Sequence, residues 1–436
     1  MKRTIVVSML QETGHLNPTF KLMRELAARG HAVRYFALPD LASRIEEQGF
    51  FVEPWFPDLF PKGFAEHDRE LGRLAFRRRV TARFLEVSER LLAGRDVAAW
   101  LAANRPDLLL VDVNEPRMSL LAAKLALPSV LVNTSLPQTW DPGVPPIRSG
   151  RKFEPGALGR LKAGTEWVAF TAKRRASAEL ASLVGARPPY DAVRRLAPRF
   201  GVTASDLDTR TTYMPQPRGR TELVLCPEAF DFPRPATTSR YYVASVDLER
   251  REGPLDFVPD ERPLVFCSLG TQVYRPEDTP RFLRTLVEVF AAHLEWRLLL
   301  SIVRHPAPDV LGPLPPNVTL VRGAPQLAVL RKARAMITHG GLGSIKECVL
   351  LGVPMLVVPL DIDQPGNAAR VEYHGVGIRA DVRRSTHQSL ADALGRLLTG
   401  ACDEPIRKLR TAFQSVENSA RGADLVERIL EQGTGP

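Results

Sequence analysis

Residues 323–364 read GAPQLAVLRKARAMITHGGLGSIKECVLLGVPMLVVPLDIDQ. The pattern predicts an apolar strand over Ala335 to Thr338, a glycine-rich turn, a helix over about Ser344 to Leu351 and a second apolar strand over Met355 to Val358. A Gly-Val-Pro run ends the helix. This order predicts a βαβ unit, in which the turn lies between the end of a strand and the start of a helix.

The turn carries polar groups suited to a nucleotide sugar. Free backbone N–H groups and the helix dipole favour a phosphate there, although a glycine-rich turn alone is as often an ordinary tight turn. His339 adds a ring N–H donor and Ser344 a hydroxyl. Glu347 lies on the same helix face and can accept hydrogen bonds from a ribose diol. Asp363 and Gln364 follow the next strand, at the edge where open α/β sheets bind ligands.

With these residues the segment resembles the donor signature of family-1 glycosyltransferases, in particular bacterial macrolide and natural-product enzymes. The resemblance implies an α/β protein of GT-B fold, with two Rossmann-like domains facing each other across a cleft. Matched position by position, it implies that His339, Gly341 and Ser344 contact the diphosphate and that Glu347 contacts the ribose. It implies further that Asp363 and Gln364 contact the sugar hydroxyls and that Gln326 borders the base.

The chain departs from the plant members of that family at the base and the phosphate turn. Gly323 stands where they carry a stacking tryptophan, and Gly343 where they carry an asparagine. Arg322 is the candidate to stack on the base through its guanidinium plane. The remaining predicted donor contacts come from turns at Gly14, Gly270 and Thr271.

The candidate general base is His15, at the end of a strand predicted over Thr4 to Leu10. An imidazole with a pKa near 6.5 suits that role, although a lone histidine beside a helix start is more often a cap or a packed residue. Asp112 follows the apolar strand Leu108 to Val111. An acid at the end of a buried strand needs a polar partner, and the alternative is that it lies on the surface or caps a helix. The resemblance implies that His15 is the catalytic base, that Asp112 orients it, and that the displacement inverts the anomeric carbon.

The length of 436 residues predicts two domains. We expect an N-terminal acceptor domain over 1–246, a linker over 247–262 and a C-terminal donor domain over 263–420. The resemblance implies that the last helix, within 421–436, packs back on the first domain.

Four separated cysteines argue against a zinc site or a disulfide framework and fit a reducing cytoplasm. No apolar run is long enough for a signal peptide or a membrane span. Asp361-Ile362-Asp363 has the form of a metal-binding acid pair, but the resemblance assigns Asp363 to the sugar. We therefore expect no metal and no permanently bound cofactor, only a UDP-sugar as co-substrate.

Positive charge is concentrated in the N-terminal half, with 34 Lys and Arg against 23 Asp and Glu in residues 1–220. The excess positive charge either forms an ordinary solvated surface or attracts an anionic acceptor or an anionic membrane surface. A basic amphipathic helix is predicted within Arg69 to Arg95. Nucleic acid is not an expected partner, because no binding motif accompanies the arginines. The predicted acceptor contacts, some forming an aromatic rim beside Arg77 to Arg83, are Trp55, Phe56, Phe60, Asn114 and Trp140.

We therefore expect a cytoplasmic, inverting, metal-independent transferase, monomeric or homodimeric, that moves a hexose to a hydroxyl of a small hydrophobic or aromatic natural product. UDP-glucose is favoured because Asp363 and Gln364 are useful only if the sugar presents hydroxyls. Two alternatives stay open. One is another GT-B enzyme, either a lipid-linked sugar transferase or a nucleotide-sugar epimerase, and the other is a non-catalytic helper protein with the same fold.

Overall fold

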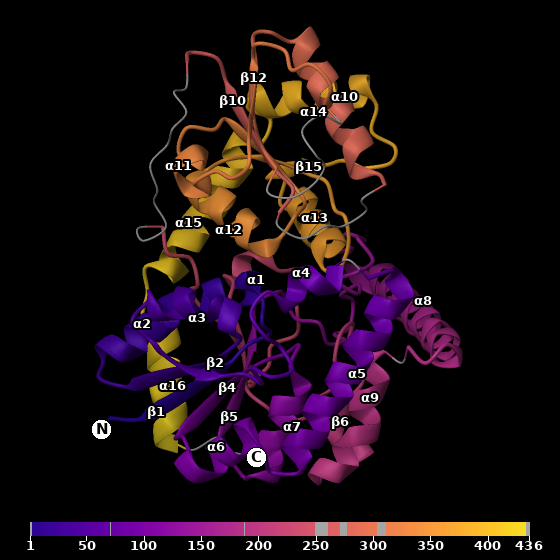
Figure 1. The fold of residues 1–436 in the computed structure, drawn as a ribbon. Coiled ribbons are helices and arrows are strands. Elements are labelled where there is room, and N and C mark those ends of the chain that lie inside the picture. Colours follow the sequence, from indigo (N-terminus) through magenta and orange to yellow (C-terminus); the bar gives the residue numbers. More distant parts are fainter. Residues whose placement is uncertain are drawn as a thin grey trace.

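The computed structural model describes residues 2–69, 71–186, 188–248, 260–270, 277–302 and 311–432. Within these residues two parallel sheets form two layered bodies, one above the other in Figure 1. Each sheet has helices on both faces, as parallel sheets require because both faces are buried.

The N-terminal sheet has the strand order β3-β2-β1-β4-β5-β8-β9 among the described residues. Its strands are β1 (Thr4–Ser8), β2 (Ala32–Ala37), β3 (Phe51–Pro54), β4 (Leu108–Asp112), β5 (Ser129–Asn133), β8 (Glu222–Val224) and β9 (Arg240–Tyr242). A small antiparallel pair joins β6 (Leu207–Asp208) and β7 (Gln216–Pro217).

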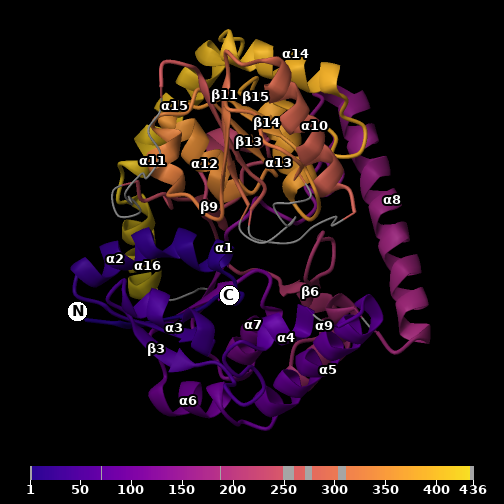
Figure 2. The ribbon, with the colours of Figure 1, turned by 45° about the horizontal axis from the view of Figure 1, so that its top comes forward.

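Helices surround this sheet. They are α1 (Thr13–Leu16), α2 (Phe20–Ala28), α3 (Pro39–Glu46), α4 (Phe64–Arg69), α5 (Arg73–Leu92), α6 (Val97–Asn104), α7 (Pro116–Lys124), α8 (Gly156–Leu183) and α9 (Pro189–Leu196). Short 3₁₀ turns are η1 (Asn17–Thr19), η2 (Ala197–Phe200), η3 (Ala204–Asp206) and η4 (Glu228–Phe230). Figure 2 shows α8 as a long rod along the outside of the molecule.

The C-terminal sheet has the order β12-β11-β10-β13-β14-β15 among the described residues. Its strands are β10 (Leu264–Ser268), β11 (Arg297–Ser301), β12 (Val318–Val321), β13 (Ala335–Thr338), β14 (Met355–Val357) and β15 (Gly377–Arg379). Its helices are α10 (Thr279–Ala292), α11 (Gln326–Leu330), α12 (Leu342–Leu351), α13 (Gln364–Tyr373), α14 (His387–Leu398) and α15 (Asp403–Glu417).

The predicted βαβ unit around residue 340 is confirmed. Its first strand is β13, as predicted, and its second, β14, ends one residue early. The helix α12 begins at Leu342, two residues before the predicted start, because Gly341 takes the extended N-cap conformation. At the other end of the chain the turn predicted after β1 is wrong, since residues 13–19 are helical.

The last described helix, α16 (Arg421–Gln432), returns to the N-terminal sheet. Ala423, Leu425 and Val426 are buried in the same apolar cluster as Ile5 of β1 and Leu22 of α2. The chain thus crosses between the two bodies at least twice. Most of the linker predicted over 247–262, namely 249–259, lies outside the described residues.

Candidate active site

His15 and Asp112 form a hydrogen-bonded pair at the carboxyl ends of two neighbouring strands. β1 pairs with β4, so the segment after β1 meets the end of β4. Nδ1 of His15 lies 2.6 Å from Oδ2 of Asp112. The backbone N–H groups of Leu10 and Asn114 donate to the same carboxylate at 3.2 and 2.8 Å. Asp112 is buried and held in place, and Nε2 of His15 is left to accept a proton.

The electrostatics of His15 follow from this pairing. Burial lowers the pKa of His15, but the charge and hydrogen bond of Asp112, with the charges of Glu12 and Asp363, outweigh burial and raise it to about 8. Neighbouring carboxylates favour the imidazolium that forms when a base takes a proton. The pair is therefore built to stabilise a protonated His15.

Sequence reasoning missed the two residues that follow β5. Oγ1 of Thr134 lies 2.9 Å from Nδ1 of His15. The hydroxyl of Ser135 donates to Oδ2 of Asp363 at 2.7 Å, across the cleft from the C-terminal sheet. The signal that could have found them is the polar run Asn-Thr-Ser directly after an apolar strand, the same pattern that marked Asp112.

On the opposite side of the cleft, the glycine-rich turn closes around His339. A Cβ at Gly341 would lie 2.7 Å from Nε2 of His339, and one at Gly270 would lie 2.7 Å from its Cε1. Burial lowers the pKa of His339 to about 4 against the opposing charge of Asp363, so the ring is neutral. Nδ1 is buried with no hydrogen-bond partner in the described part of the chain. Thr271, predicted beside Gly270, lies outside the described residues.

The start of α12 gathers three other predicted donor residues. Nε2 of Gln326 lies 3.2 Å from Oγ of Ser344 and 2.5 Å from Oε2 of Glu347. Gly343 is exposed and faces open space, and Arg322 is exposed at the end of β12. Together with the orphaned atom of His339, this places donors and acceptors around a helix N-terminus that suits a nucleoside diphosphate.

The two acids after β14, Asp361 and Asp363, contact different residues. Ile362 has a φ of +60°, a left-handed conformation that β-branched residues rarely adopt. Asp361 faces Arg148 at 3.2 Å, while Asp363 faces Ser135 and Asn367. Within the described ranges, no group of three or more His, Cys, Asp or Glu side chains could hold a metal ion.

Gln364 is buried at the start of α13. Its amide oxygen accepts the backbone N–H groups of Leu360 and Asp361 at 2.8 and 3.0 Å. Gln364 therefore fixes the turn that presents Asp363, in addition to any contact with a sugar.

The aromatic rim expected of Trp55 and Phe56 is wrong. Their side chains are 3% and 0% exposed and belong to the core beneath α5. Phe60 is partly buried, with the guanidinium of Arg83 5.3 Å from its ring centroid. The rim fails because aromatic side chains near the sheet edge bury more area in the core than on a surface.

The other two predicted acceptor residues are partly buried. Asn114 follows β4, and its Oδ1 is buried without a partner among the described residues. Trp140 stacks under Arg210, whose guanidinium lies 4.7 Å from the ring centroid. Neither residue lines the cavity described next.

A polar cavity of about 170 Å³ opens against the N-terminal sheet. Val113 and Asn133 line it, and these residues adjoin Asp112 and Thr134. Gln138, Gln216 and Arg240 also contribute, and Oε1 of Gln216 is buried without a partner among the described residues. A polar cavity with an unsatisfied amide oxygen suits a ligand that carries polar substituents.

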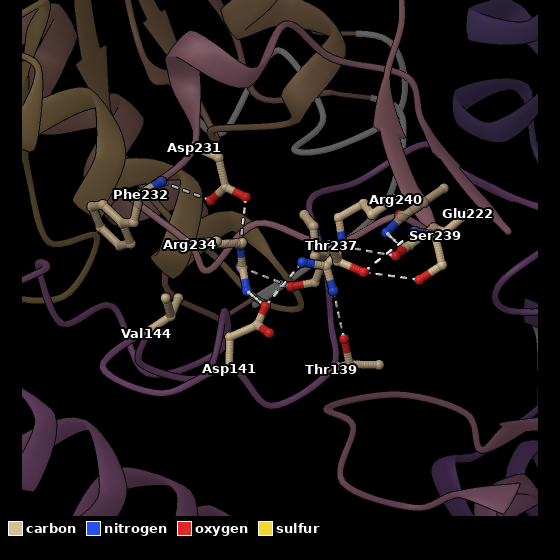
Figure 3. A network of polar contacts seen from close by, with 12 residues as sticks. Thr139, Asp141, Val144, Glu222, Asp231, Phe232, Arg234, Thr237, Ser239 and Arg240 are labelled. Carbon is tan, nitrogen blue, oxygen red and sulfur yellow. Dashed lines mark hydrogen bonds and ion pairs between the residues drawn. The ribbon is translucent and has the colours of Figure 1, made fainter. Parts of the chain in front are cut away.

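An ion-pair network borders this cavity (Figure 3). Arg234 bridges Asp231 and Asp141 at 2.7 and 2.5 Å, and Arg240 contacts Asp141 at 3.0 Å. From the C-terminal sheet, Arg370 of α13 reaches Asp231 at 2.7 Å. These guanidinium groups hold the pKa of Asp231 well below its usual range even though burial opposes them. The network ties the two sides of the cleft together at its base.

Comparison with known sequences identifies the family. The UDP-glucoronosyl and UDP-glucosyl transferase family matches residues 55–412. Among individual relatives, the oleandomycin glycosyltransferase of Streptomyces antibioticus is 27% identical, covering 96% of this chain and 88% of the relative. The zeaxanthin glucosyltransferase of Pantoea ananas is also 27% identical, covering 96% of this chain and 94% of the relative.

Solved structures agree with the sequence comparison. The glycosyltransferase of kitacinnamycin superposes with a TM-score of 0.73 at 28% identity, covering 98% of both chains. The calicheamicin glycosyltransferase CalG4 superposes with a TM-score of 0.68 at 25% identity over all of both chains. The predicted GT-B fold, two Rossmann-like sheets either side of a cleft, is confirmed.

Proposed function

The chain belongs to the UDP-glucoronosyl and UDP-glucosyl transferase family, and from that premise we propose that it transfers a hexose from a nucleotide sugar to a hydroxyl of a small hydrophobic natural product. Such a transferase needs a base on one side of a cleft and a diphosphate site on the other. The observation that carries the proposal is the His15–Asp112 pair, which faces Asp363 of the donor side across the Ser135 contact.

The proposed reaction is an inverting displacement. Nε2 of His15 takes the acceptor's proton, and the acceptor oxygen forms a bond to the anomeric carbon as the bond to the diphosphate oxygen breaks. Asp112 holds the imidazole in the correct tautomer and stabilises its positive charge. His339, Ser344 and the N-terminus of α12 stabilise the leaving diphosphate, and no metal ion is required.

We propose that the sugar is held by Asp363 and that UDP-glucose is the preferred donor. Two observations support this: Asp363 already accepts a hydroxyl, that of Ser135, at 2.7 Å, and relatives include glucosyltransferases of zeaxanthin. A deoxysugar would lack a hydroxyl to donate to this carboxylate, so the site would lose one hydrogen bond that a hexose supplies. We propose that the acceptor occupies the polar cavity beside Val113 and Asn133.

The test is transfer by the purified protein from UDP-glucose, and from dTDP-glucose, to a panel of phenolic and macrolide acceptors in the presence of a chelator. We expect glycoside formation, and we expect His15→Ala to lower turnover about 10²- to 10⁴-fold while UDP binding stays within about twofold. Wild-type turnover by His15→Ala would refute the base assignment. Hydrolysis or epimerisation of the donor without transfer would favour another enzyme of the same fold, and absence of any donor binding would favour a helper protein.

A further inference from the structure

The long helix α8 carries a stripe of exposed apolar side chains along its whole length. Five large apolar residues on it are exposed: Leu158 (62%), Leu161 (65%), Val168 (71%), Leu180 (67%) and Leu183 (81%). At about 100° per residue these positions fall within an arc of about 120°. Smaller exposed residues at the same angles are Ala169, Ala172 and Ala176, and the polar Thr165 and Glu179 also lie within the arc, so the stripe is mostly apolar. Over 28 residues the stripe is about 42 Å long.

The opposite face of α8 accounts for how the helix is anchored. Gly159, Ala163, Trp167 and Ala178 are its buried residues. The indole N–H of Trp167 donates to the backbone oxygen of Val144 at 2.9 Å. Because α8 is held by this narrow face of mostly small residues, the apolar stripe points away from the body of the protein. Figures 1 and 2 both show α8 along its outer side.

Cations border the stripe on both sides. Lys173 lies at one margin, next to Lys162 and Glu166, and Arg175 lies at the other, by the same helical angles. Lys162 is already paired with Glu154 at 2.6 Å. Residues 151–200, which contain α8, hold 11 Lys and Arg against 4 Asp and Glu, so +7 of the N-terminal half's +11 comes from this segment. An apolar stripe flanked by cations on long flexible stems is the pattern of helices that lie in a membrane interface.

A second helix, α5, contacts the chain just after the C-terminal end of α8. Nε of Arg78 on α5 donates to the backbone oxygen of Val184 at 2.9 Å. α5 also exposes Leu74, Phe76 and Val80. By helical angle Phe76 and Val80 lie about 160° around the helix from Arg78, so they do not continue the stripe of α8. Of the 15 large apolar residues that are exposed in the described part of the chain, five lie on α8 and four on α5. The other arginines of this region are engaged, since Arg79 and Arg83 both pair with Asp68.

We propose that α8 docks flat on an anionic lipid bilayer. The leucines would enter the boundary between head groups and acyl chains, and Lys173 and Arg175 would contact lipid phosphates. Charge decides between this partner and a second copy of the chain. Two copies related by a twofold axis would place the same cations against each other, whereas an anionic surface neutralises them. None of the helices in the described part of the chain is long and apolar enough to cross a membrane, so the contact is peripheral.

The experiment is sedimentation of the full-length protein with vesicles of phosphatidylcholine alone or with phosphatidylserine added. We expect binding to the anionic vesicles that weakens as salt is raised, because the Debye length falls. The triple variant Leu161→Ser, Val168→Ser, Leu180→Ser should lower the partition coefficient at least about tenfold, because three apolar side chains no longer leave water. Lys173→Glu with Arg175→Glu should lower it by about tenfold or more.

Matched changes on the C-terminal sheet's side serve as controls. Leu294→Ser removes an apolar residue that is 53% exposed, and Lys332→Glu with Lys408→Glu reverses two exposed cations. Both should bind as the wild type does, and the unfolding midpoints of all variants should match because the positions are exposed. Equal binding to the two vesicle types at low salt, or undiminished binding by the triple variant, would overturn the proposal. A different pair of results would also overturn it: the wild type stays in the supernatant with vesicles, and it forms a dimer in analytical ultracentrifugation that the triple variant does not form.

Discussion

Two histidines of one cleft are driven to opposite protonation states by their neighbours. His15 lies against the buried carboxylate of Asp112, and its pKa rises to about 8. His339 is enclosed by Gly270 and Gly341, and burial lowers its pKa to about 4. A neutral His339 can donate its one ring N–H to a phosphate oxygen without adding charge, while His15 is suited to hold a proton taken from an acceptor. Environment, rather than residue type, separates the two roles.

The raised pKa of His15 predicts the pH dependence of transfer. Only neutral His15 can act as a base, so kcat/KM should rise with pH and level off above about pH 8. Asp112→Asn removes the charge that raises the pKa of His15, so burial should move the pH at which kcat/KM rises to a value below 6.5. Turnover should also fall about 10²-fold or more. Because the folded-state pKa is raised, His15 stabilises the fold fully below about pH 6.5 and loses that contribution as pH rises through about 8. A rate profile with the same limb in both proteins would contradict the assignment.

Two glycines of the phosphate turn give a matched pair of variants. Gly341 has ordinary backbone angles, so the effect of Gly341→Ala comes from its Cβ, which would lie 2.7 Å from Nε2 of His339. We expect the KM for the nucleotide sugar to rise about tenfold or more, because the imidazole must move. At Gly343 a Cβ meets open space, and alanine also favours the helix, so Gly343→Ala should change KM less than about twofold. Equal effects at the two positions would show that His339 does not shape the donor site.

The helices that build the donor pocket also attach it to the N-terminal sheet. α12 begins at the phosphate turn, and one turn later its Lys346 donates to the backbone oxygen of Leu225 at 2.7 Å. α13 follows Asp363 and carries Arg370, which contacts Asp231. Each of these helices therefore starts at the donor pocket and contacts the N-terminal half of the chain farther along its length.

The Arg370–Asp231 pair should be costly to break from one side only. Both side chains are 1% exposed, so Arg370→Met leaves a buried carboxylate short of a partner and should cost about 3–5 kcal/mol of the free energy of unfolding. The double variant with Asp231→Asn should cost less than the sum of the single variants, as measured by urea unfolding. Arg407→Met, which breaks an exposed pair with Glu404, should change stability by less than about 1 kcal/mol. Strict additivity would mean that the two groups do not interact.

Local patterns predicted some strands of each sheet but not the contacts between the sheets. Alternating helices and apolar strands have signals within a few residues, and so β1, β4, β13 and β14 were predicted. The pairing of His15 with Asp112 was instead implied by the family resemblance. Ser135 and Asp363 are 228 residues apart, and no local signal records that they meet. Likewise, hydrophobicity cannot distinguish Trp55, which is buried, from Leu183, which is exposed. Which apolar residues enter the core is decided by how the helices pack.

The return of α16 to the first sheet gives a test of how the two halves depend on each other. Leu425 and Val426 are buried against β1 and α2, although nearly the whole C-terminal sheet lies between these segments in the sequence. Leu425→Ala with Val426→Ala should destabilise the N-terminal sheet by about 3–5 kcal/mol, because it leaves a cavity in that sheet's core. Amide exchange should therefore accelerate in β1 and β2 and stay unchanged in β10 and β13, with Arg428→Ala on the exposed face of α16 as the control. Faster exchange in both sheets would instead show that the two halves unfold as one unit, and then the ion pairs at the base of the cleft, rather than α16, would set the stability of the whole molecule.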